Sequence, residues 1–74
     1  MFNFRKRILK RKILSVKAGI IEKEADIAYH KGLLEYEKES LSEEQIKQYE
    51  TAIKADEAQI KINKDWLRYV EPLL

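Results

Sequence analysis

The sequence predicts an all-α protein, an antiparallel hairpin of two long helices that packs into a helical bundle with other chains. Isoleucine or leucine recurs every seven residues in both halves, a spacing that returns to one helix face after two turns. Only two glycines and one proline interrupt the 74 residues. Between the two halves, Ser42 and Gln45 have the spacing of an N-terminal capping box. The turn is therefore expected at residues 39–43.

Residues 1–17 form a basic N-terminal arm. They contain seven Lys or Arg and no acidic residue, whereas residues 18–74 contain eight basic and 13 acidic residues. The arm is expected to be helical, with a kink or break near Gly19, because glycine inside a helix costs about 1 kcal/mol relative to alanine. The seven cations are Arg5, Lys6, Arg7, Lys10, Arg11, Lys12 and Lys17.

Residues 18–74 are predicted to be the hairpin itself. Folding at the turn opposes the two heptad patterns, which brings Ile27 near Ile60 and places His30 near Asp56. The heptad positions are Ile13, Ile20, Ile27, Leu34 and Leu41 on the first helix, and Ile46, Ile53, Ile60 and Leu67 on the second. The other expected neighbours are Ile20 with Leu67, Leu34 with Ile53, and Lys23 with Asn63.

Each helix also carries a second apolar stripe, which a single hairpin does not bury. Soluble monomers avoid large exposed apolar patches, so the stripes predict association with other chains, for example as a four-helix bundle of two hairpins. The alternative is an arm that turns at Gly19 and folds back over the hairpin. The expected partner interface is Ala18, Ile21, Ala25, Ala28 and Gly32 on the first helix and Ile62, Trp66, Tyr69 and Leu73 on the second.

Length and composition favour a partner as well. A chain of 74 residues forms one small domain, whose core rarely supplies more than about 3–5 kcal/mol, and without cysteine it has no disulfide. We expect no transmembrane segment and no secretory signal, and so a location in the cytoplasm or within an intracellular or viral particle. The Ile, Lys and Glu bias is typical of AT-rich genomes, including those of phages.

Residues suited to catalysis are few: one histidine, no cysteine and no glycine-rich phosphate loop. Glu22, Asp26 and His30 share a helix face at four-residue intervals and could approach a metal. A di-iron bundle requires Glu-x-x-His, however, and Ile27 occupies the glutamate position. We therefore expect no catalytic residue, metal, cofactor or small-molecule substrate, and a protein that is not an enzyme.

The leading functional prediction is a structural or assembly protein that self-associates or docks into a larger complex such as a phage virion. The alternative is a nucleic-acid-binding accessory protein, whose arm contacts the phosphates of DNA or RNA. The arm could equally meet an acidic protein surface, because residues 35–50 carry a net charge of −4. A further alternative is a small inhibitor or adaptor of a host enzyme, docking through Trp66 and Tyr69.

Overall fold

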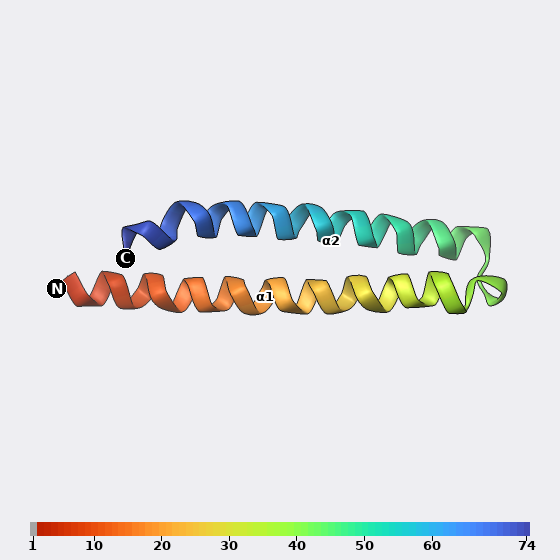
Figure 1. The fold of residues 1–74 in the computed structure, drawn as a ribbon, viewed down its shortest axis with the longest axis horizontal. Helices are drawn as coiled ribbons and strands as arrows, with labels where there is room; N and C mark the ends of the chain where they lie inside the picture. The colour runs from red at the N-terminus through yellow and green to blue at the C-terminus, as the bar shows by residue number, and fades with distance from the viewer. Residues whose placement is uncertain (1) are drawn as a thin grey trace.

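The structure, a computed structural model, describes residues 2–74 and the side chains from residue 4 onwards. Two long helices, α1 (Phe2–Tyr36) and α2 (Glu43–Val70), are joined by the short 3-10 helix η1 (Lys38–Ser40). A second 3-10 helix, η2 (Glu71–Leu73), ends the chain. The helices lie antiparallel along their length (Figure 1), and residues 2–74 contain no strand. The predicted helical hairpin is therefore confirmed.

The break expected near Gly19 does not occur. α1 is one helix of 35 residues that includes Gly19, and Figure 1 shows it without a kink. Ile13 and Ile20, on either side of the glycine, are both buried against α2, so packing outweighs the local helix penalty. An arm that folds back at this point is excluded, because residues 2–17 are the first turns of α1. Whether residues 1–17 act as a separate functional unit stays a prediction.

The turn occupies residues 37–42, so it begins two residues before the predicted start at residue 39. The predicted capping box is present. The Gln45 backbone N–H donates to Ser42 Oγ at 3.1 Å, and the Ser42 backbone N–H donates to Gln45 Oε1 at 2.9 Å. Glu43 and Glu44 lie in the first turn of α2, where the helix dipole favours negative charge. These contacts fix where α2 begins.

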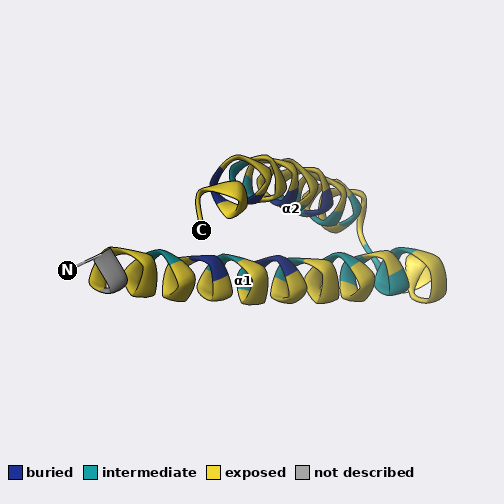
Figure 2. Cartoon of the chain, turned by 60° about the vertical axis from the view of Figure 1, so that its left-hand side comes forward, coloured by how far each residue is buried: buried dark blue, intermediate teal, exposed yellow. Residues whose placement is uncertain are grey.

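The core is a single seam between the helices. Figure 2 shows the buried and half-buried positions gathered on the sides of α1 and α2 that face each other, with exposed positions elsewhere. Leu9, Val16, Ile27 and Trp66 are partly buried against the main cluster. The buried residues are Ile13, Ile20, Ile53, Ile60, Leu67 and Val70. Five of these six are predicted heptad positions, and Val70 is the exception.

The hairpin is a thin rod with a large surface. It measures 58 × 15 × 14 Å, and its radius of gyration of 16.9 Å exceeds the roughly 11 Å expected for a compact chain of this length. Its accessible surface is 6290 Å², whereas a compact protein of 8.8 kDa exposes about 4,800 Å². The rod therefore leaves about 1,500 Å² more surface in water than a compact fold would.

Replacing Ser42 with alanine tests the capping box. We expect Ser42→Ala to lower the free energy of unfolding by about 1 kcal/mol, because the Gln45 N–H loses its acceptor. The melting temperature should fall by about 4–8 °C in a circular dichroism melt. Ser40→Ala is the matched control, since Ser40 lies in the same turn outside the box, and a similar loss in the control would contradict the assignment.

Candidate interaction surfaces

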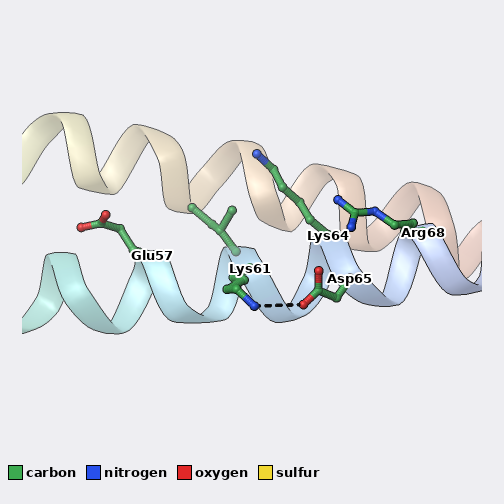
Figure 3. A pocket seen from close by; sticks show the side chains of 6 residues that line it. Glu57, Lys61, Lys64, Asp65 and Arg68 are labelled. Carbon is green, nitrogen blue, oxygen red and sulfur yellow. Dashed lines mark hydrogen bonds and ion pairs between the residues drawn. The ribbon is translucent and has the colours of Figure 1, made fainter.

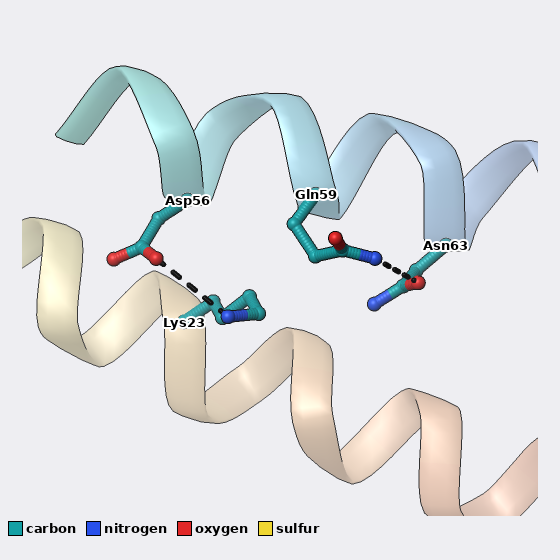
Figure 4. A network of polar contacts seen from close by, with 4 residues as sticks. All are labelled: Lys23, Asp56, Gln59 and Asn63. Atoms are coloured by element: carbon teal, nitrogen blue, oxygen red, sulfur yellow. Dashed lines mark hydrogen bonds and ion pairs between the residues drawn. The ribbon is translucent and has the colours of Figure 1, made fainter. Parts of the chain in front are cut away.

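The seam contains a polar section near its middle, and its pairs differ from those expected (Figure 4). Lys23 Nζ lies 3.6 Å from Asp56 Oδ1, with side chains 35% and 19% exposed. Asn63 pairs within α2 instead of with Lys23, and its Oδ1 accepts a hydrogen bond from Gln59 Nε2 at 3.0 Å. Asp56 was expected beside His30. The turn at residues 37–42 sets a register that places Lys23 opposite Asp56 and His30 opposite Tyr49.

His30 packs among aromatic rings instead. Its ring stacks on Tyr49, with centroids 5.3 Å apart, and meets the edge of Tyr29 at 5.6 Å. Its Nδ1 is buried without a hydrogen-bond partner. Within residues 2–74, no group of three or more His, Cys, Asp or Glu is arranged to hold a metal ion. His30 therefore belongs to the packing of the seam.

The second stripe of α1 faces solvent in the single chain. Ala18, Ile21, Ala25 and Ala28 are exposed, and Gly32 is half-buried. Ile21 is 67% exposed. A methyl group added at Gly32 would meet no atom within 4 Å, so nothing inside the hairpin requires a glycine there.

The sequence reasoning missed one member of this stripe. Leu14 is 66% exposed and lies four residues before Ala18, so it continues the alternation of three- and four-residue steps. That spacing could have identified it. The outer face of α1, defined as Leu14, Ala18, Ile21, Ala25, Ala28 and Gly32, is therefore one apolar line more than five turns long.

The second stripe of α2 divides into two kinds of residue. Ile62, Tyr69 and Leu73 are exposed, with Tyr69 74% exposed. Trp66 is only half-exposed, because part of its ring packs against the core cluster. Trp66 therefore contributes to the hairpin itself, whereas the other three residues present apolar surface outwards.

The two stripes lie on opposite sides of the hairpin. At 100° per residue, Glu57 and Lys64 fall on one side of the buried line of α2, and Ile62 and Trp66 fall on the other. The outer face of α1 borders the charged side, because Ala28 and Glu57 line one groove between the helices. The chain thus offers two separate apolar surfaces.

The charged side of α2 holds a second shallow groove (Figure 3). Lys61 Nζ lies 3.4 Å from Asp65 Oδ2, and the other charged side chains along the groove are exposed. The groove is open to solvent and is lined by side chains of both charge signs. Its lining residues are Glu57, Ile60, Lys61, Lys64, Asp65 and Arg68.

The two ends of the rod carry opposite charge. The basic end is defined by the seven cations of residues 5–17, all exposed and spread around α1. Within the described chain, Lys17 is the member of this set that forms an ion pair, at 3.4 Å from Glu71. The acidic tip, residues 35–50, contains six Glu and two Lys and surrounds the turn at the other end. The rod is therefore strongly polarised along its axis.

Comparisons with known proteins give no indication of function for this chain. No family model, no curated protein and no solved structure matches the chain. Among the described residues, no helix has the length and apolar character needed to cross a membrane.

The contrast between Trp66 and Tyr69 is testable. Trp66→Ala should lower the free energy of unfolding by about 2 kcal/mol, because the lost ring area packs on the core. Tyr69→Ala should change it by less than about 0.5 kcal/mol in the dilute monomer, because the ring makes little contact there. Urea unfolding followed by circular dichroism measures both variants, and equal losses would contradict the difference in packing.

Proposed function

We propose that the protein is a non-enzymatic structural or assembly component, a helical hairpin that associates with copies of itself or docks into a larger particle. The observation that carries the proposal is the outer face of α1, a continuous apolar line that the hairpin leaves in water. A location within an intracellular or viral particle fits such a role.

The size of the exposed surface supports this proposal. The rod carries about 1,500 Å² beyond a compact fold, which is more than the roughly 800 Å² that each partner buries in a standard protein–protein interface. The chain has no disulfide to compensate for its narrow core. Association therefore supplies apolar burial that two helices alone do not provide.

Sedimentation of the purified protein at micromolar concentration tests self-association. We expect a species heavier than 8.8 kDa, and we expect Ile21→Gln to weaken it at least tenfold, because burying one isoleucine contributes about 1.5–3 kcal/mol. Lys54→Gln, on the charged side of α2, is the control and should leave the mass distribution unchanged. A stable monomer that also recovers no partner in a pull-down would overturn the proposal.

Nucleic-acid binding by the basic end is the second candidate, favoured by the exposure of all seven cations. Phosphate recognition needs charge and reach but no precise geometry, and these side chains project in every direction around α1. The cations therefore suit contact with a phosphate backbone more than the reading of a base sequence. Docking on a host enzyme through Trp66 and Tyr69 stays a prediction.

Salt dependence tests this candidate. If the end contacts about five phosphates of duplex DNA, the logarithm of the binding constant should fall with the logarithm of salt concentration with a slope of about −4.5. Changing residues 5, 6, 7, 10, 11 and 12 to Gln should abolish retention on DNA at low salt. The same change at Lys54, Lys61 and Lys64 should not, and retention by the first variant would refute a phosphate-binding role.

A further inference from the structure

We infer that two copies of the hairpin pair side by side in antiparallel orientation, with the outer face of α1 in contact and each basic end against the other copy's acidic tip. This inference rests on the proposed self-association and adds the occupant, the orientation and the face. Three independent features of the rod support it: its dimensions, its charge distribution and the position of the apolar line.

The dimensions favour lateral contact over end-to-end contact. A side of the rod, 58 Å long and 14 Å wide, offers about 800 Å² to a partner, the amount each side of a standard interface buries. An end of 15 × 14 Å offers about 200 Å², which is in the range of crystal-packing contacts. Lateral pairing therefore covers about half of the roughly 1,500 Å² of excess surface, whereas end-to-end stacking leaves most of it exposed.

The charges favour the antiparallel arrangement. A parallel pair would set seven cations beside seven cations at one end, and two tips of net charge −4 beside each other at the opposite end. An antiparallel pair sets +7 against −4 at both ends. At physiological salt the screening length is about 8 Å, so this preference acts only between surfaces in close contact, as lateral pairing provides.

The apolar line is placed along the rod so that the lines of two antiparallel copies can overlap completely. It runs from Leu14 to Gly32 and is centred on residue 23, midway between the basic end and the α1 part of the acidic tip. A two-fold axis there brings Leu14 of one copy towards Gly32 of the other. Bulky Leu14 then meets the one residue of the line without a side chain, which gives the glycine a use that the single hairpin lacks.

Because the natural chain has no cysteine, single introduced thiols report the orientation. Lys6→Cys marks the basic end and Ser40→Cys marks the acidic tip, both at exposed positions about 45 Å or more apart along one rod. A flexible bismaleimide should link the two variants to each other when they are mixed, and should link neither variant to itself. Circular dichroism of each variant checks that it remains helical.

The glycines supply a second readout. Gly32→Gln should weaken association at least tenfold, because the side chain fills the space for Leu14, although glutamine is the better helix former. Gly19→Gln is the matched control away from the outer face, and it should leave association within about twofold.

The outcomes distinguish a failure of antiparallel pairing from a failure of the proposed self-association. Links between unlike variants alone support antiparallel pairing. Links between like variants, or an oligomer that links at neither end, overturn the inference and leave self-association standing. An oligomer that tolerates Gly32→Gln overturns the contact face. A monomer at every concentration overturns the inference and self-association, and if that monomer also recovers no partner in a pull-down, it overturns the proposed function as well.

Discussion

Two helices share only one line of contact, and this constraint governs the whole molecule. A helix in a compact bundle buries two of its sides against neighbours, but each helix here has one neighbour. The buried residues accordingly form a single row along the facing sides of α1 and α2, with half-buried residues such as Leu9, Val16 and Ile27 beside them, and the outer face of α1 lies outside that row. The exposed outer face of α1 and the exposed residues of α2 are direct results of this geometry rather than local defects.

The polar section of the seam sets the alignment of the helices. A half-buried ion pair contributes little net stability, because removing charges from water offsets much of their attraction. Its value lies in the choice of register, because sliding α1 by one heptad along α2 would separate Lys23 from Asp56. In one direction Asp56 would meet apolar Val16, and in the other it would exchange the lysine ammonium for His30. His30 adds a shape constraint, since its ring fits against Tyr49. Aliphatic residues provide most of the buried surface. The four side chains of the Lys23–Asp56 and His30–Tyr49 pairs favour one register of the two helices.

Much of the fold could be predicted from the sequence, because it depends on local chemistry and on the heptad period. The capping box, the two helices and the buried isoleucines follow from spacing alone. The continuity of α1 through Gly19 could not be predicted in this way. The low helix propensity of glycine favours a break there, but the packing of Ile13 and Ile20 on either side of it keeps the helix continuous. The partners of Asp56 and the half-buried state of Trp66 also depend on the exact stagger between helices. For the candidate surfaces, the sequence predicted both apolar stripes but did not include Leu14 in the stripe of α1. The identity of a partner depends on a second surface, which the pattern of one chain does not contain.

The main core cluster lies far from the turn. It joins Ile13 to Val70, which lie towards opposite ends of the chain, whereas Ile53, the other buried residue among residues 4–74, lies outside the cluster and closer to the turn. The half of the hairpin nearest the turn therefore has the smaller share of tertiary packing, and local opening should begin there, with its amides exchanging hydrogen first. Most proteins loosen at their chain ends. Here Ile13 and Val70 pack in one cluster, so cooperative unfolding requires separating residues more than fifty positions apart in sequence.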